Sequence, residues 1–172
     1  SGSAVRETMR KLRDAIPAVT LRTSMIVGFP GETEADVEEL LEFIEDAEFD
    51  RLGVFKYSEE EGTAAARLDG KISEEEKEER WQKVMEAQAA ISRKKNEALI
   101  GSIRRVIIDG TDSDSGKTVG RTEAHAPEVD GVVYVGGWGA NSHDKPPQSG
   151  EMIDVRMTGA LDYDLIGEIN HV

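Results

Sequence analysis

The pattern of apolar residues changes at Gly101 and divides the chain into two parts. Before Gly101, apolar positions at helical spacing alternate with short apolar runs, and after it short strand-like runs follow one another with Gly-, Asp- and Ser-rich turns between them. The first pattern is typical of a parallel α/β sheet, and five short strands within about 70 residues predict a small OB-like β-barrel. We therefore predict an α+β, multidomain chain: a partial parallel α/β unit (1–72), a linker helix (73–101) and a small antiparallel barrel (102–172).

The first 57 residues follow the order helix, strand, turn, helix, strand. Helical spacing from Val5 to Ile16 predicts the first helix, and residues 21–27 become fully apolar at their end, as a buried strand would. Thr33 offers an N-cap for the second helix, and residues 51–57 form the second strand candidate. Two strands do not make a stable parallel sheet. We expect further strands from elsewhere, or self-association through the open edge of the partial barrel.

The turn between Gly28 and Gly31 connects the first strand to the second helix. Such a turn places backbone N–H groups where an anion or a polar ligand could bind, although it could equally be a tight corner alone. Neither the Gly-Lys-Ser/Thr of a P-loop nor the G-x-G-x-x-G dinucleotide pattern is present. Lys56 and Tyr57 end the next strand, on the side of an α/β sheet where ligands bind.

A long helix is predicted between the two parts. Ser73 and Glu76 form a capping box, the helix runs from Glu74 to about Leu99, and Gly101 ends it. Its predicted inner face consists of Trp81, Val84, Met85, Gln88, Ile91, Lys95 and Leu99. Within the barrel, residues 136–150 form a long loop of the kind that is commonly functional or mobile.

The chain contains no cysteine, which excludes disulfides, thiolate catalysis and cysteine-ligated metal centres within it. Three histidines, His125, His143 and His171, are too scattered for a metal site, and we expect each at the surface. No metal-binding residue is therefore predicted. No apolar run approaches the roughly 18 residues that span a bilayer, so we expect no membrane association and a cytoplasmic location.

Acidic residues outnumber basic ones by 35 to 21, which gives a net charge of −14. From Ser102 to Val172, six basic side chains stand against twelve acidic ones. Nucleic-acid binding usually needs a basic face, whereas an acidic surface attracts a basic protein. The charge predicts a basic protein partner over RNA, unless it serves solubility alone.

Several stretches resemble one enzyme family. IVGFPGET, the acidic helix after it and FDRLGVFKYSEEEGT resemble the methylthiotransferase branch of the radical S-adenosylmethionine enzymes. KEERWQKVMEAQAAISRKKNEALIG is similar to the helix that links their catalytic barrel to a TRAM domain. GRTEAHAPEVDGVVYV and LDYDLIGEI resemble the TRAM domain of the RimO group, because the related MiaB group usually lacks the A-P-E-x-D-G signature found at residues 126–131.

The resemblance implies a reaction. RimO-type enzymes add a methylthio group to the β-carbon of an aspartate in a basic small-subunit ribosomal protein, using S-adenosylmethionine and two four-iron four-sulfur clusters. The cysteines that hold these clusters are absent here, so the chain resembles the C-terminal part of such an enzyme, beginning inside its TIM-like barrel. We expect this part alone to bind no cofactor, to contain no catalytic residue and to be inactive.

The resemblance also implies which residues contact the cofactor. The fifth barrel strand of radical enzymes often carries G-x-I-x-G-x-x-E, which matches here at Ile26 and Gly28, with Ser24 at the first glycine and Glu32 one residue late. The pattern therefore assigns Glu32 no cofactor contact. The predicted residues are Ile26, Val27 and Gly28 on the adenine side, and Phe55, Lys56, Tyr57 and Ser58 at the end of the next strand.

Two alternatives remain open at this point. One is a tRNA-modifying relative whose TRAM domain grips RNA through Arg104, Arg105, Lys117 and Arg121. The other is a non-catalytic binding module that never supported the reaction.

Overall fold

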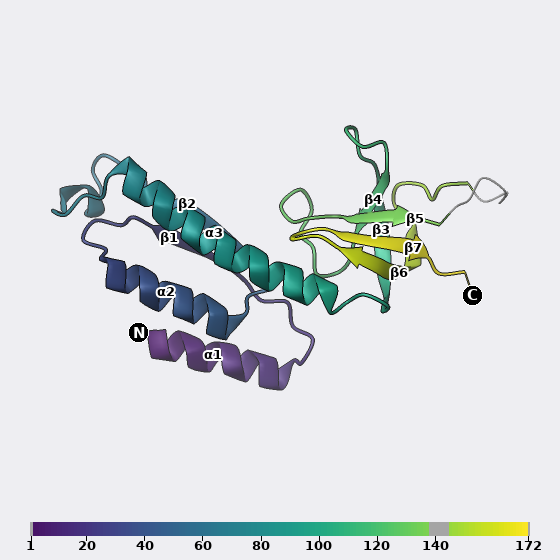
Figure 1. Cartoon of the computed structure of the whole chain (residues 1–172), viewed down its shortest axis with the longest axis horizontal. Helices are drawn as coiled ribbons and strands as arrows, with labels where there is room; N and C mark the ends of the chain where they lie inside the picture. The colour runs from purple at the N-terminus through teal and green to yellow at the C-terminus, as the bar shows by residue number, and fades with distance from the viewer. Residues whose placement is uncertain (1, 138–144, 172) are drawn as a thin grey trace. The chain divides into compact units, whose positions relative to one another are not determined.

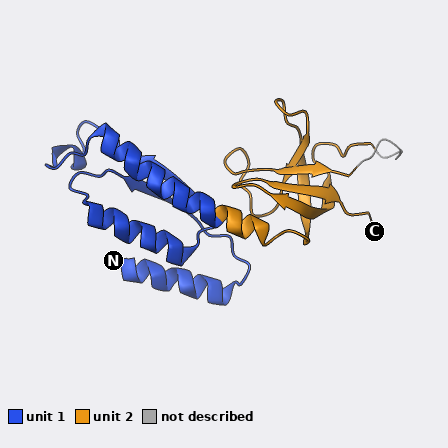
Figure 2. Cartoon of the chain, viewed as in Figure 1, with its two compact units in different colours: residues 1–91 blue, residues 92–172 orange. Residues whose placement is uncertain are grey.

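The computed structural model describes residues 2–137 and 145–171, which form two compact units, Ser1–Ile91 and Ser92–Val172 (Figures 1 and 2). The division falls within the longest helix. Each unit has its own hydrophobic core and is described separately below.

The first unit has the predicted order of elements. Helix α1 (Gly2–Ala15), strand β1 (Arg22–Val27), helix α2 (Glu34–Ala47) and strand β2 (Arg51–Lys56) precede the long helix α3 (Glu74–Glu97). The segment between β2 and α3, predicted to be a loop, contains one short 3-10 helix, η1 (Ala65–Arg67).

Both predicted N-caps are formed. The Thr33 hydroxyl accepts a hydrogen bond from the Asp36 amide, and the Asp36 carboxylate accepts one from the Thr33 amide at 2.8 Å. Ser73 and Glu76 make the same reciprocal pair at the start of α3. These capping boxes satisfy amide donors that the first turn of a helix leaves unpaired, and so fix where α2 and α3 begin.

Strands β1 and β2 pair in parallel, with Arg22 opposite Arg51 and Ile26 opposite Phe55. One face of this two-stranded sheet packs on the helices: Val27 and Val54 share a core with Ile44 of α2 and with α3 residues that include Val84. The other face is bare among the described residues. The prediction that the end of β1 is buried on both sides is therefore wrong for Ile26, which is 57% exposed, because no described helix covers its face.

The apolar stripe predicted for α1 is only partly used. Met9 is buried in a small core with Leu21, Ala47 and Phe49, whereas other members of the stripe are exposed: Val5, Leu12 and Ile16. These side chains share one side of the helix, so α1 presents an apolar surface that nothing within the described residues covers.

The second unit is a closed five-stranded barrel, as predicted, with strand order β3-β4-β5-β7-β6. Its strands are β3 (Ile103–Thr111), β4 (Thr118–Arg121), β5 (Val133–Gly136), β6 (Met152–Ala160) and β7 (Leu165–Ile169). The predicted antiparallel pairing holds for four of the five neighbouring pairs, but β5 and β7 are parallel, because a closed barrel with an odd number of strands cannot have every neighbouring pair antiparallel. In the part of the chain that the structure describes, closure of the barrel leaves no unpaired edge strand. The barrel therefore offers no edge for pairing with another sheet.

The barrel interior is filled by aliphatic side chains that alternate with outward-facing residues along the strands. Its buried residues are Val106, Ile108, Val133, Val135, Val155, Met157 and Leu165. The last turns of α3 are tied to this unit by Asn96, whose side-chain amide donates to the carbonyl oxygen of Leu161 at 3.1 Å.

Replacing a core residue of the barrel should destabilise that unit specifically. Leu165 is fully buried, so Leu165→Ala should lower the free energy of unfolding of the barrel by roughly 2–5 kcal/mol through lost contacts and the cavity left behind. The exposed Leu161 provides the control, and Leu161→Ala should cost less than about 1 kcal/mol. Native-state amide exchange at Val133 and Val155 measures both effects, and an equal loss in the two variants would contradict the proposed core.

Candidate functional site

The turn after β1 is shaped by two glycines and by the start of α3. Gly28 and Gly31 adopt the left-handed backbone conformation, with φ of 75° and 86°. A Cβ atom on Gly28 would lie 2.3 Å from Cγ of Lys77, which is shorter than any real contact, whereas a Cβ on Gly31 would meet nothing within 4 Å. Glycine is therefore required at position 28 for two reasons, the left-handed backbone conformation and the close approach of Lys77.

Three backbone amides at this turn are engaged inside the protein. Gly28 donates to the Glu32 carboxylate at 2.8 Å, and Gly31 donates to the carbonyl oxygen of Gly70 at 2.9 Å. The amide of Glu32 itself bonds to the carbonyl oxygen of Phe29. These three donors are not available to an anion, so the structure does not favour the anion-binding turn suggested by the sequence.

Glu32 and Arg80 form a buried ion pair beside the turn. Nη1 of Arg80 lies 2.8 Å from Oε1 of Glu32, and the two side chains are only 8% (Arg80) and 13% (Glu32) exposed. The same Nη1 also donates to the backbone carbonyl of Glu32 at 3.2 Å. Because Oε1 of Glu32 also accepts the Gly28 amide, one carboxylate oxygen joins the end of β1 to α3.

The bare face of the sheet carries an exposed apolar pair. Ile26 and Phe55 are register partners, 57% and 59% exposed. The Phe55 ring leans over Gly53, where an added Cβ would lie 3.4 Å from the ring. Two large apolar side chains at the carboxyl ends of adjacent parallel strands form a small flat surface of the kind that a ligand or further protein covers.

The predicted cofactor residues separate into four groups. Ile26 and Phe55 lie on the bare face. Val27 is fully buried in the core under the helices and its carbonyl accepts the Tyr57 amide at 2.8 Å, so the structure gives it a packing role. Gly28 lies in the turn after β1, where it contacts Glu32 and Lys77. The remaining three residues line a pocket beyond the end of β2: Lys56, Tyr57 and Ser58.

This pocket, of about 420 Å³, is lined by both signs of charge. Its lysines each meet a carboxylate: Lys56 with Glu78 at 2.9 Å, Lys71 with Glu59 at 2.6 Å and Lys77 with Glu74 at 2.7 Å. Opposite charges in such pairs largely cancel, so the pocket has no strong preference for an anion or a cation.

These pairs shift the titration of their members. The hydrogen bond from Lys77 lowers the pKa of Glu74, and the hydrogen bond from Lys56 lowers the pKa of Glu78. Hydrogen bonds to their carboxylate partners raise the pKa of Lys56 and Lys71. Because the pKa values of Glu74 and Glu78 are depressed in the folded state, the stabilisation from their pairs is fully present above the ordinary glutamate value of 4.5 and is lost as the pH falls through the depressed values.

Tyr57 stands between the pocket and the turn. Its ring packs edge-on against Phe29, with centroids 5.2 Å apart, and Nζ of Lys77 lies 5.6 Å from its centre. The Tyr57 hydroxyl is buried and has no hydrogen-bond partner among the described residues. A buried hydroxyl without a partner is unfavourable, so a polar group bound in the pocket would gain from pairing with it.

Sequence reasoning missed Glu32, Lys77 and Arg80. The capping box at Ser73 sets the phase of α3 and places Lys77 and Arg80 on the same side as Trp81 and Val84. Both are charged, however, and charged residues are ordinarily placed on the solvent side. Only the tertiary structure shows that they reach the turn after β1.

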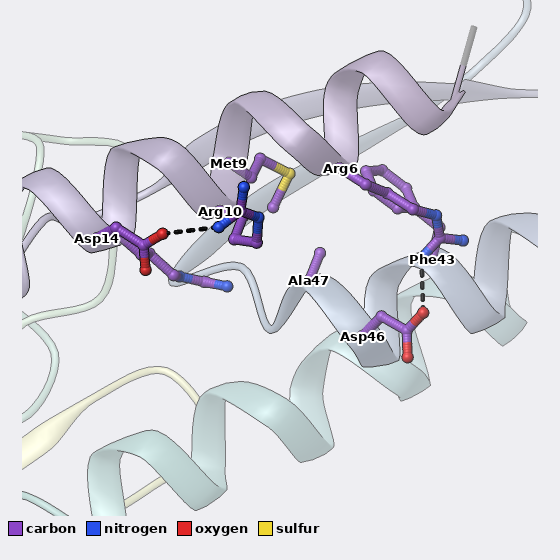
Figure 3. A pocket seen from close by; sticks show the side chains of 8 residues that line it. Arg6, Met9, Arg10, Asp14, Phe43, Asp46 and Ala47 are labelled. Atoms are coloured by element: carbon purple, nitrogen blue, oxygen red, sulfur yellow. Dashed lines mark hydrogen bonds and ion pairs between the residues drawn. The ribbon is translucent and has the colours of Figure 1, made fainter.

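A second pocket, of about 400 Å³, lies between α1 and α2 (Figure 3). Arg6 lies over the ring of Phe43 and pairs with Asp46 at 2.6 Å, while Arg10 pairs with Asp14 at 3.0 Å. Arg13 donates to the carbonyl oxygen of Glu48. Every arginine of this pocket already has an oxygen partner, and its lining gives no sign of a particular ligand.

The family-like signature of the barrel has a structural role. The carboxylate of Asp130 accepts the Ala126 amide at 2.7 Å, which closes the loop on itself. A Cβ on Gly131 would lie 2.2 Å from the carbonyl oxygen of Tyr163, so only glycine fits beside the turn between β6 and β7. Asp164 in that turn accepts the Val132 amide. These contacts hold the signature loop in place.

The basic residues of the RNA-binding alternative are partly neutralised. Arg105 pairs with Asp154 and Arg121 with Asp109, while Nζ of Lys117 lies 5.4 Å over the ring of Tyr134. Arg104 is exposed. Two of the four candidate phosphate contacts therefore already have carboxylate partners on neighbouring strands.

The histidines are only partly where they were expected. His125 is buried, not at the surface, and its Nδ1 lies 2.7 Å from the Thr122 hydroxyl. His171 is exposed, and His143 falls outside the described residues. Across residues 2–137 and 145–171, no group of three or more potential ligands could hold a metal ion, and no helix is long and apolar enough to cross a membrane.

Comparisons with known proteins found one matching domain family and several similar proteins. The TRAM domain family matches residues 100–169. A ribosomal protein uS12 methylthiotransferase RimO from Geobacter sulfurreducens is 48% identical over 166 residues, which are 96% of this chain and 36% of that protein. The protein of the same name from Natranaerobius thermophilus is 49% identical over 95% of this chain and 35% of its own length. The chain thus spans about a third of the curated relatives it matches.

The two glycines of the turn should differ in their tolerance of a side chain. Gly31→Ala should cost about 1 kcal/mol, since alanine there meets only backbone strain. Gly28→Ala should cost about 1–3 kcal/mol more, because its Cβ also displaces Lys77. Urea unfolding followed by Trp81 fluorescence measures the difference, and equal destabilisation of the two variants would rule out the tight Lys77 contact.

Proposed function

Because this chain belongs to the RimO-type methylthiotransferases, we propose that it forms one wall of the S-adenosylmethionine site and the substrate-binding barrel of such an enzyme. The whole enzyme would add a methylthio group to the β-carbon of an aspartate in a small-subunit ribosomal protein. The bare Ile26–Phe55 face of β1 and β2 carries this proposal.

The residues of that face fit the adenine side of the cofactor. Ile26 and Phe55 offer apolar surface to a flat ring, and Gly53 leaves room for the Phe55 side chain to lie along the sheet. The amides of Gly28, Gly31 and Glu32 are engaged, so we infer that apolar contact and carbonyl oxygens, and not these three donors, bind the ring. Lys56, Tyr57 and Ser58 directly follow Phe55 in the chain and would close the site at the carboxyl end of β2.

S-adenosylmethionine with a four-iron four-sulfur cluster would supply the radical that removes hydrogen from the substrate carbon. This chain contains no cysteine, so the cluster ligands would come from parts of the enzyme outside it. The role of this chain is to bind and orient: it exposes an apolar wall, shields the strand ends with α3 and contributes no catalytic side chain. By itself we expect it to be inactive.

The barrel suits a basic protein substrate. Its segment from Ser102 to Val172 has six basic and twelve acidic residues, and the pairing of Arg105 and Arg121 further reduces its attraction for phosphates. We therefore infer that the barrel contacts a basic ribosomal protein. Preferential binding of tRNA would instead favour the RNA-modifying alternative.

Loss of the apolar face should weaken cofactor binding in the intact enzyme. Ile26→Ser and Phe55→Ser should each raise the dissociation constant of S-adenosylhomocysteine by about tenfold or more, since each removes on the order of 1.5 kcal/mol of apolar contact. Leu68→Ser, at another exposed apolar position of the same unit, should leave it unchanged. Calorimetric titration gives these constants, and unaltered affinity in both test variants would refute the proposed wall.

The partner of the barrel can be identified by salt dependence. The full-length enzyme can be titrated with the basic ribosomal protein and with tRNA at several salt concentrations. It should bind the ribosomal protein more tightly than tRNA. Tighter binding to tRNA, falling steeply with salt, would instead support the RNA-modifying alternative.

A further inference from the structure

Three side chains on one side of the first turns of α3 contact the carboxyl ends of the strands or the turn after β1. Lys77, Arg80 and Trp81 share one side of the helix, being three and four residues apart. Nε1 of Trp81 donates to the carbonyl oxygen of Val54 at 3.0 Å, which secures β2. The Lys77 stem packs against Gly28, and Arg80 holds Glu32, so β1 is secured as well.

Among these contacts, the Arg80–Glu32 pair has the chemistry to fix the turn in one geometry. Arg80 reaches both the carboxylate and the backbone carbonyl of Glu32 through Nη1, at 2.8 and 3.2 Å. Charge-assisted hydrogen bonds are stronger than neutral ones, and a buried pair is little weakened by salt or water. Glu32 is thus held by its side chain and by its main chain at once.

The effect passes from Glu32 to the strand that carries the cofactor face. Oε1 of Glu32 accepts the amide of Gly28, which directly follows Val27 and is two residues from Ile26. A displaced Glu32 would release that amide. The end of β1, and with it the position of Ile26, would then lose a restraint that no described element on the bare side replaces.

We propose that Arg80 is a positioning residue for the S-adenosylmethionine wall, acting through Glu32 and Gly28 without touching the cofactor. This inference rests on the proposed function of the Ile26–Phe55 face. It gives Glu32 a role in holding the turn, where the sequence pattern assigned it no contact. It also makes α3, which continues into the second unit, the element that sets the geometry of the cofactor edge.

The chain offers a matched control on the same two segments. Nζ of Lys83 pairs with Glu34 at 2.6 Å, again between α3 and the start of α2, but these side chains are 47% and 58% exposed. An exposed pair of this kind contributes little to stability. Lys83→Gln therefore removes a cation from the same region of α3 without affecting the end of β1.

Arg80→Lys is the main test, because lysine keeps the charge but its side chain is one atom too short to place a donor where Nη1 meets both oxygens of Glu32. In the intact enzyme it should weaken S-adenosylhomocysteine binding by about fivefold to tenfold. Amide exchange at Gly28 should accelerate by about tenfold relative to that at Ile44, a core residue of α2. Lys83→Gln should change neither quantity.

A neutral double variant separates the lost charge from the lost hydrogen bond. Arg80→Gln alone leaves the Glu32 carboxylate buried without its cation, which is unfavourable. Adding Glu32→Gln removes that charge, and the new side-chain amide still has a carbonyl oxygen that can accept the Gly28 amide hydrogen. The double variant should therefore bind S-adenosylhomocysteine more tightly than Arg80→Gln alone, and weaker or equal binding would contradict the route through Glu32.

The outcomes separate the two proposals. Faster exchange at Gly28 with unchanged affinity, while Ile26→Ser and Phe55→Ser still weaken binding, would overturn the positioning role and leave the cofactor wall intact. Equal acceleration at Gly28 and Ile44 would mean that Arg80 only stabilises the fold, which also overturns it. Unchanged S-adenosylhomocysteine affinity in the Ile26→Ser and Phe55→Ser variants would contradict the proposed function itself.

Discussion

The one-sided cover of the β1–β2 sheet is the constraint on which the first unit depends. Helices α2 and α3 bury Val27 and Val54 on one face, and nothing within the described residues covers Ile26 and Phe55 on the other. A two-stranded parallel sheet gains too little from its own hydrogen bonds to hold a strand end still. The restraint comes from α3, through the buried Arg80–Glu32 pair and through Trp81, and this leaves the apolar face ordered as well as exposed.

The two units use charge in different ways. In the first, a buried ion pair determines geometry, and surface pairs such as Lys83–Glu34 surround it with little energetic consequence. In the second, carboxylates on neighbouring strands engage arginines that would otherwise be free to bind phosphates. The net charge of −14 is therefore compatible with the proposed basic protein partner and with a proposed cofactor wall that is itself uncharged.

Local patterns predicted the elements well because local physics determines them. The capping boxes at Thr33 and Ser73 indicated the helix starts, and short strand-like runs separated by Gly-, Asp- and Ser-rich turns indicated the five barrel strands. Burial was harder to predict, since a run such as Met25–Val27 looks the same whether one face or both are covered, and the Val5–Ile16 stripe does not reveal that most of it is exposed. The roles of Glu32, Lys77 and Arg80 depend on contacts between residues 48 and 49 positions apart, which single-sequence spacing cannot supply.

The central claim is that Ile26 and Phe55 face the adenine ring. Photo-crosslinking of the intact enzyme with an azido-adenine derivative of S-adenosylmethionine, followed by peptide mapping, tests it most directly. We predict adducts within residues 24–28 and 53–58, and their suppression by excess S-adenosylhomocysteine. Adducts confined to the outer surface of α1 and α2, or to the barrel, would contradict the account.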